Sequence, residues 1–142
     1  MNDAFTGGCA CGAVRYEIGD QPVAMNHCEC RHCQLRSGTG HGSYLTFASR
    51  AAVRVTGQVG EWEAVGEGGT VKRYSFCAAC GSPVYLTFPQ MPHVFVIHAG
   101  SLDDPARFKP DHVLYASRAH AWDVMDARLT AFPKMPSRAA PT

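Results

Sequence analysis

Seven cysteines in closely spaced groups constrain this 142-residue chain more than any other feature of its sequence. The groups are C-x-C at Cys9 and Cys11, C-x-C-x-x-C from Cys28 to Cys33, and C-x-x-C at Cys77 and Cys80. A disulfide framework is one interpretation, but the count is odd and the N-terminus lacks the basic segment and apolar run of a secretion signal. Thiols stay reduced in the cytoplasm. We therefore expect a cytoplasmic protein whose cysteines bind metal.

Length and composition predict one globular domain over residues 1–142. Hydrophobic residues make up 46% of the chain and charged residues 18%, which argues against disorder. We expect an ordered core over residues 5–132 and a frayed, proline-containing tail after it. The net charge of +1, without a basic stripe, argues against a nucleic-acid partner. The longest apolar run, residues 94–97, is too short to span a bilayer, so we expect no membrane partner.

Short runs rich in valine, tyrosine and phenylalanine lie between glycines and prolines, a pattern that predicts many short antiparallel strands. The expected strands are Ala13–Ile18, Ser43–Phe47, Val53–Thr56, Glu61–Val65, Val71–Phe76, Pro83–Thr87 and Val94–His98. The fifth and sixth flank the C-x-x-C pair and could form a hairpin. The last is nearly all apolar, so we expect it at the centre of its sheet. A helical turn over Gln34–Ser37 and a short helix over His120–Met125 complete the prediction.

The first and last cysteine groups together have the donor set of a closed zinc site. Side chains two apart on an extended chain point the same way, so Cys9 and Cys11 could hold one ion. A C-x-x-C pair at a tight turn, here Cys77 and Cys80, is the usual knuckle of zinc ribbons. Four thiolates complete a tetrahedral shell with no open position, so we expect a structural zinc. The alternative is that these cysteines are simply buried as small apolar residues.

The middle group offers three cysteines, Cys28, Cys30 and Cys33, and no fourth. Three protein ligands with one exchangeable position is the pattern of a catalytic zinc, so two zinc ions per chain are expected. An open position on zinc suits a small thiol, because a coordinated thiol is deprotonated at neutral pH. Three cysteine thiolates and a bound thiolate would give the zinc site a net negative charge. The nearby cations that could offset this charge are Arg31, Arg36, Lys72 and Arg73.

A histidine could instead close the second site and make it structural. Three histidines are near in sequence: His27, His32 and His41. His32 lies between two ligands and should aim elsewhere, and His27 should point to the opposite face of its strand. His41 follows the flexible stretch from Ser37 to Gly40 and could reach the metal; by position it is also the candidate general acid. A redox-active cluster and iron–sulfur ligation are further alternatives.

The order of these motifs resembles a known family. The matching segments are Gly7–Tyr16, Cys28–Gly38, Phe76–Pro83, Ala99–Pro105, and Ser117 with Trp122. In this order they resemble the glutathione-dependent formaldehyde-activating enzyme family (GFA domain), which also includes centromere protein V. The resemblance covers most of the chain.

The resemblance implies an all-β fold of the β-tent type, built from small antiparallel sheets with zinc-binding knuckles. It also implies a structural zinc on the first and last cysteine groups and a second zinc on Cys28, Cys30 and Cys33, where glutathione would be handled. The implied activity is that of a carbon–sulfur lyase that forms or splits S-hydroxymethylglutathione. The alternative is a non-catalytic domain in which both metals are structural and the function is partner binding or thiol sensing.

Overall fold

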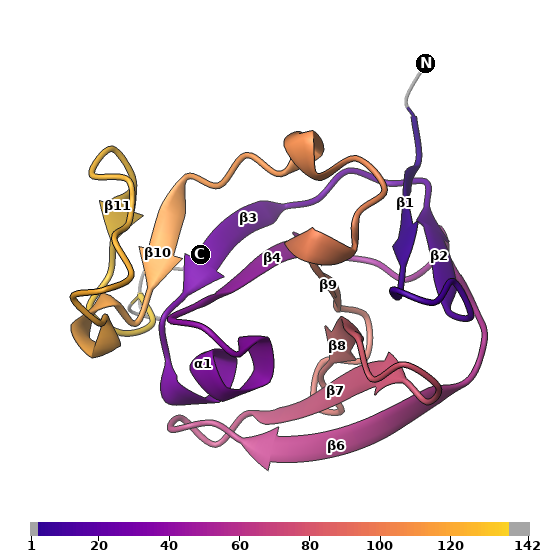
Figure 1. Cartoon of the computed structure of the whole chain (residues 1–142), viewed down its shortest axis with the longest axis horizontal. Helices are drawn as coiled ribbons and strands as arrows, with labels where there is room; N and C mark the ends of the chain where they lie inside the picture. Colours follow the sequence, from indigo (N-terminus) through magenta and orange to yellow (C-terminus); the bar gives the residue numbers. More distant parts are fainter. Residues whose placement is uncertain (1–2, 137–142) are drawn as a thin grey trace.

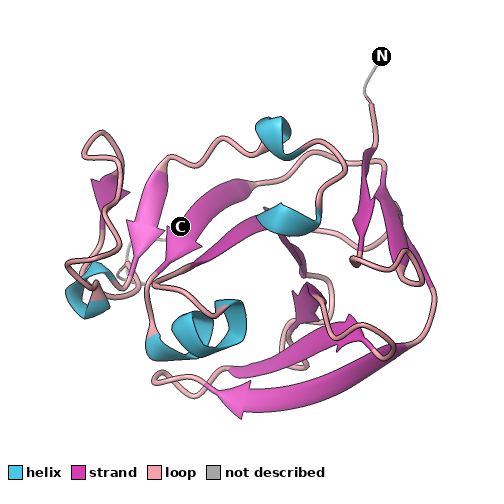
Figure 2. Ribbon diagram, in the orientation of Figure 1, coloured by secondary structure: helices cyan, strands magenta, loops and turns pink. Residues whose placement is uncertain are grey.

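A computed structural model describes residues 3–136 as two β-sheets with one short α-helix among these residues (Figures 1 and 2). The smaller sheet has three antiparallel strands in the order β1-β2-β5. Their bounds are Phe5–Gly8, Arg15–Ile18 and Val53–Thr56. Tyr16 and Ile18 of β2 point inward and the two residues beside them point outward, as the alternation of apolar and polar side chains predicts.

The larger sheet has the strand order β11-β10-β3-β4-β9-β8-β7-β6. In chain order its strands are β3 (Ala24–Cys28), β4 (Gly42–Phe47), β6 (Val59–Val65), β7 (Val71–Cys77), β8 (Pro83–Thr87), β9 (Phe95–His98), β10 (His112–Leu114) and β11 (Thr130–Ala131). The sheet bends so that β3 and β4 face β7 and β6 across helix α1 (Arg31–Ser37), which lies between them (Figure 1). The fold therefore encloses the start of α1 on two sides.

Helix α1 begins and ends at residues with clear capping roles. Cys30 is its N-cap, and its sulfur accepts from the Cys33 N–H at 3.4 Å. Gly38 ends the helix in the left-handed conformation, with φ of 77°, and its N–H donates to the Gln34 carbonyl. Three 3-10 turns follow later in the chain: Ala99–Ser101, Pro105–Arg107 and Ala116–Arg118.

Two apolar clusters form the core. The first lies between the small sheet and β4, β8 and β9, and the Phe5 and Phe47 rings meet edge to face at its centre, with centroids 5.7 Å apart. The second packs around α1, and its buried members are Cys28, Cys30, Cys33, Tyr44, Tyr74, Leu86 and Val96. Five of the seven cysteines are thus part of the core, since the first cluster also contains Cys9 and Cys77.

Most of the expected elements are present. All seven expected strands form, with ends shifted by at most two residues; β7 and β8 form the expected hairpin, and β9 lies inside its sheet between β4 and β8. The mostly β structure confirms the all-β class. The expected turn over Gln34–Ser37 is the second half of α1, which starts at Arg31.

Two expectations were wrong. Residues His120–Met125 form turns instead of a helix, because an isolated segment this short is not a stable helix and its Asp123 is held by His41 on another element. The sheets are also not wholly antiparallel, since β10 pairs in parallel with both β3 and β11.

The tail that was expected after Phe132 is described only in part. Ser117 donates a hydrogen bond to the Pro133 carbonyl, and residues 137–142 lie outside the described residues. In residues 3–136 no helix has the length and apolar character needed to cross a membrane.

Candidate metal centres

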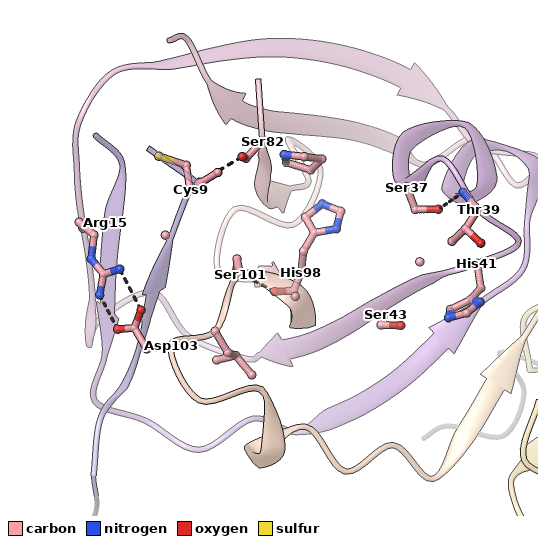
Figure 3. Close-up of a pocket in the computed structure, with 16 residues that line it drawn as sticks. Cys9, Arg15, Ser37, Thr39, His41, Ser43, Ser82, His98, Ser101 and Asp103 are labelled. Atoms are coloured by element: carbon pink, nitrogen blue, oxygen red, sulfur yellow. Dashed lines mark hydrogen bonds and ion pairs between the residues drawn. The ribbon is translucent and has the colours of Figure 1, made fainter. Parts of the chain in front are cut away.

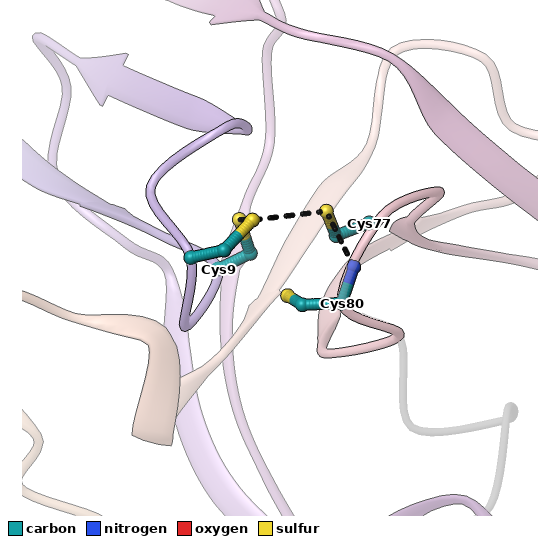
Figure 4. A group of neighbouring side chains, drawn as sticks. Cys9, Cys77 and Cys80 are labelled. Atoms are coloured by element: carbon teal, nitrogen blue, oxygen red, sulfur yellow. Dashed lines mark hydrogen bonds between the residues drawn. The ribbon is translucent and has the colours of Figure 1, made fainter.

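The structure brings the first and last cysteine groups together. The sulfurs of Cys9, Cys11, Cys77 and Cys80 all lie within 4.8 Å of one another (Figure 4). Cys11 Sγ is 3.7 Å from both Cys9 Sγ and Cys77 Sγ. Four sulfurs at this spacing could hold one metal ion, and they would join the turn after β1 to the turn after β7.

Both pairs lie in tight turns. The expectation of an extended chain at Cys9 and Cys11 was wrong, because the Gly12 N–H donates back to the Cys9 carbonyl at 3.2 Å and folds the chain over. The Gly81 N–H makes the equivalent bond to the Cys77 carbonyl at 2.9 Å. Gly12 and Gly81 have φ of 83° and 80°, which glycine adopts without strain. The two turns thus form a matched pair of knuckles.

Backbone N–H groups point at these sulfurs. The Val14 N–H donates to Cys9 Sγ at 3.2 Å, and the N–H groups of Ala79 and Cys80 each donate to Cys77 Sγ at 3.3 Å. The bond from Val14 is the main reason that the pKa of Cys9 is lowered. Hydrogen bonds of this kind favour the thiolate form, which is the form that binds metal.

The middle cysteine group forms a second, separate cluster. The sulfurs of Cys28, Cys30 and Cys33 also lie within 4.8 Å of one another. Cys28 ends β3, Cys30 caps α1 and Cys33 lies in its first turn, so the strand-to-helix transition converges the three side chains. All three are buried, with exposed fractions of 7%, 8% and 4%. Among residues 3–136, no histidine, aspartate, glutamate or further cysteine joins them as a ligand.

The three thiols influence one another strongly. Hydrogen bonds with Cys28 and then Cys33 lower the pKa of Cys30, whereas hydrogen bonds with Cys28 and then Cys30 raise the pKa of Cys33. The three buried sulfurs thus share their protons through these contacts. A soft divalent ion would replace those shared protons, and thiolates are the ligands that such an ion prefers. The donor chemistry of this cluster fits a metal ion.

Two tyrosines flank this second cluster. The Tyr44 hydroxyl of β4 donates to Cys33 Sγ at 2.9 Å, a bond that reduces the charge on that sulfur when it is ionised. Tyr74 of β7 is 1% exposed, and its hydroxyl has no hydrogen-bond partner among the described residues. Burial raises the pKa of Tyr74, and the nearby sulfurs of Cys33 and Cys30 raise it further. Both rings therefore lie against the cysteines as neutral phenols.

Residues 4–118 match the family described as glutathione-dependent formaldehyde-activating enzyme. The chain belongs to this family. A Halomonas elongata protein, named provisionally as a glutathione-dependent formaldehyde-activating enzyme, is 26% identical over 114 residues, covering 75% of this chain and 71% of the relative. A crystal structure of a Rhodobacter sphaeroides protein superposes with a TM-score of 0.54 at 21% identity, covering 72% of this chain and 93% of that one. This likeness shows the shared fold.

A small cavity opens on Cys30 of this GFA domain. Its volume is about 130 Å³, and it is lined by Cys30, Arg31, His32, Gly66, Glu67, Lys72, Tyr115 and Arg118. Three of these residues are cations, and Arg118 is already paired with Glu67 at 2.9 Å. Lys72 lies close enough to Cys30 to lower the pKa of that thiol electrostatically. The access to the second cluster is therefore small and positively charged.

A larger cavity of about 640 Å³ lies on another part of the GFA domain (Figure 3). His41 and Ser43 lie on one side of it, Arg15 and Asp103 on the other, and His98 between them (Figure 3). Arg15 and Asp103 form an ion pair there. This cavity reaches Cys9 of the first cluster but is not lined by any of the three cysteines of the second.

None of the three histidines considered from the sequence closes the second cluster. His41 Nδ1 is 2.6 Å from Asp123 Oδ2, and its ring packs edge-on against His27. His27 Nδ1 is paired with Ser43 Oγ at 2.8 Å, on the face of β3 opposite Cys28, as the strand alternation predicted. His32 lines the small cavity. His41 is thus paired with Asp123 and does not join the cysteines.

Sequence reasoning missed both tyrosines. Tyr44 approaches Cys33 only because β4 returns alongside β3, with Gly42 opposite Cys28. Tyr74 shares its face of β7 with Lys72 and Phe76, a relationship that the alternation of the expected strand could have revealed. Its proximity to the cysteines depends on the bending of the larger sheet around α1, which no local pattern encodes.

Proposed function

We propose that this GFA-family protein is a zinc-dependent carbon–sulfur lyase that acts on the adduct of a small thiol and an aldehyde, such as S-hydroxymethylglutathione. One observation carries the proposal: three buried cysteine sulfurs lie within 4.8 Å of one another, and no fourth protein ligand joins them among the described residues. The name of the Halomonas relative supports glutathione and formaldehyde as the components of the adduct.

The two cysteine clusters have different parts in this proposal. Cys9, Cys11, Cys77 and Cys80 would hold a structural zinc, since four thiolates leave no position for a substrate. Cys28, Cys30 and Cys33 would hold the second zinc and leave one position for the substrate thiol. When bound there, zinc would supply Lewis-acid activation of the thiol at neutral pH.

The chain's own residues would then bind and orient the substrate. Lys72 and Arg31 lie beside Cys30 in the small cavity, where they favour an anionic thiol. Tyr44 holds Cys33 in place through its hydroxyl. Burial of the three cysteines shields their sulfurs from bulk water, whereas Lys72 is half-buried and Arg31 is exposed. Seven cysteines without a disulfide among them also suit the reducing cytoplasm, which we include in the proposal.

Exchange spectroscopy by NMR provides the test. Zinc-loaded protein is added to glutathione and formaldehyde, and exchange between free glutathione and its hydroxymethyl adduct is measured against the spontaneous background. We expect acceleration by the wild-type protein and none by Cys30→Ser. If zinc-loaded wild-type protein gives only the background rate and binds no thiol, the alternative of two structural metals takes the place of the lyase.

A further inference from the structure

Tyr74 is a fully buried tyrosine beside the second cluster, and its hydroxyl has no hydrogen-bond partner in residues 3–136. It is 1% exposed, so bulk solvent does not reach it. A buried hydroxyl without a partner destabilises a fold, and natural proteins keep few of them. The position of this one therefore calls for a ligand.

The surroundings of Tyr74 show that the missing partner is not supplied by the fold. Two side chains pack on its ring: Trp62 stacks on it at 5.8 Å between centroids, and the Arg36 guanidinium lies 5.0 Å from its centroid. The ring packs in the same cluster as Cys28, Cys30 and Cys33, and their sulfurs are near enough to act on it electrostatically.

The neighbouring tyrosine, Tyr44, differs from Tyr74 in having a hydrogen-bonded hydroxyl. Tyr44 lies in the same cluster and has its hydroxyl committed to Cys33 Sγ at 2.9 Å. Tyr74 thus offers a free donor beside the same three sulfurs. A substrate held by its sulfur at the open position would carry its reacting carbon and oxygen on the adjacent atoms.

We propose that the Tyr74 hydroxyl is a catalytic residue that donates a hydrogen bond to the aldehyde oxygen of the thiol–aldehyde adduct. This inference rests on the proposed function. In the forward direction the thiolate sulfur forms a bond to the carbonyl carbon, and the π electron pair of the carbonyl moves onto its oxygen. That oxygen accepts the bond from Tyr74 and then takes a proton from water, which leaves as hydroxide. In the reverse direction hydroxide takes that proton back as the carbon–sulfur bond breaks and its electron pair stays on the sulfur.

The donor is useful because charge appears on that oxygen only as the reaction proceeds. A preorganised donor aimed at developing charge stabilises the transition state more than the ground state. Removing one such donor typically lowers the rate about 10²-fold or more. It should have little effect on the thiol alone, which lacks the oxygen.

The test compares the zinc-loaded wild-type chain with Tyr74→Phe, and uses Tyr16→Phe as the matched control. Tyr16 is also buried, but its hydroxyl is bonded to Ser101 Oγ at 2.7 Å in the other core cluster. Three quantities are measured for each protein: the thermal unfolding midpoint, the affinity by calorimetry for glutathione and for its formaldehyde adduct, and the exchange rate by NMR.

We expect Tyr74→Phe to unfold no earlier than wild type, because it removes an unpaired buried hydroxyl. Its affinity for glutathione should change by less than about twofold, its affinity for the adduct should fall about fivefold, and its exchange rate about 10²-fold. Tyr16→Phe should lower the unfolding midpoint and leave both affinities and the exchange rate unchanged.

Other results would overturn the inference. Equal adduct affinity and equal exchange rates for Tyr74→Phe and wild type would show that Tyr74 does not contact the substrate oxygen. Loss of glutathione affinity or of zinc in Tyr74→Phe would assign it a structural role at the cluster. Wild-type protein that holds two zinc ions but neither binds glutathione nor accelerates exchange would overturn the proposed function itself, and the role of Tyr74 with it.

Discussion

The Tyr44 hydroxyl donates a hydrogen bond to Cys33 Sγ across 2.9 Å and so joins β4 to the first turn of α1. Burial keeps the pKa of Tyr44 well above its usual range, so the group is a donor at any physiological pH. A neutral donor at this position stabilises a cluster of three thiolates without adding a metal ligand.

Loss of this hydroxyl should weaken the second metal site specifically. We expect Tyr44→Phe to destabilise the protein by about 1–3 kcal/mol, because it leaves a buried sulfur without its donor. Metal affinity at this site should fall about 10- to 100-fold, as is typical when a partner of a metal ligand is removed. Competition with a chromophoric chelator measures the affinity. Unchanged affinity at both sites would show that the bond is irrelevant to metal binding.

Gly42 should be intolerant of a side chain because the Tyr44 ring lies directly against it. A Cβ added there would lie 2.3 Å from the Tyr44 hydroxyl oxygen, so Gly42→Ala must displace the tyrosine. We expect a loss of about 1–3 kcal/mol in unfolding free energy and weaker binding of the second metal.

Gly100→Ala is the control for this substitution, since a Cβ at that position meets nothing within 4 Å. It should have no comparable effect in chemical denaturation. Equal unfolding free energies for the two variants would contradict the contact with Tyr44.

The metal content should be two zinc ions per chain, one for each cysteine cluster. Elemental analysis of protein produced with abundant zinc measures it. One ion per chain would mean that the three-cysteine cluster is weak. Protein without bound metal would refute the assignment of both clusters.

The two clusters should differ in their response to cysteine substitution. Cys77→Ser breaks a set that ties the turn after β1 to the turn after β7, so we expect a large loss of thermal stability or insolubility. Cys30→Ser alters a cluster whose three members are close in sequence, and the protein should stay folded with one zinc. Thermal unfolding and metal analysis of both variants decide this. Equal destabilisation would indicate that both sites are structural.

Binding of a small thiol should release about one proton at neutral pH. A free thiol with a pKa near 8.5 is mostly protonated there, whereas a zinc-bound thiol is a thiolate. Proton release should therefore shrink as the pH rises through the pKa of the free thiol. Calorimetric titrations with glutathione in two buffers of different ionisation enthalpy count the protons, and Cys30→Ser serves as the control without an intact site.

The sequence by itself determined seven of the eleven strands in residues 3–136 and which cysteines would act together. Alternation in Arg15–Ile18 and the apolar run in Phe95–His98 are local properties, because side-chain direction along a strand follows from backbone geometry alone. The short spacing of Cys28, Cys30 and Cys33 likewise brings three sulfurs together within one strand-to-helix transition.

Only the tertiary structure decided what surrounds the second cluster. His41 pairs with Asp123, although the two residues are far apart in the chain, and it does not join the cysteines. Tyr44 and Tyr74 belong to β4 and β7, which face each other across α1 because the larger sheet bends around the helix (Figure 1). These contacts depend on how distant elements pack against one another, and the hydrophobic pattern of each element specifies only which face is buried, not which partner covers it.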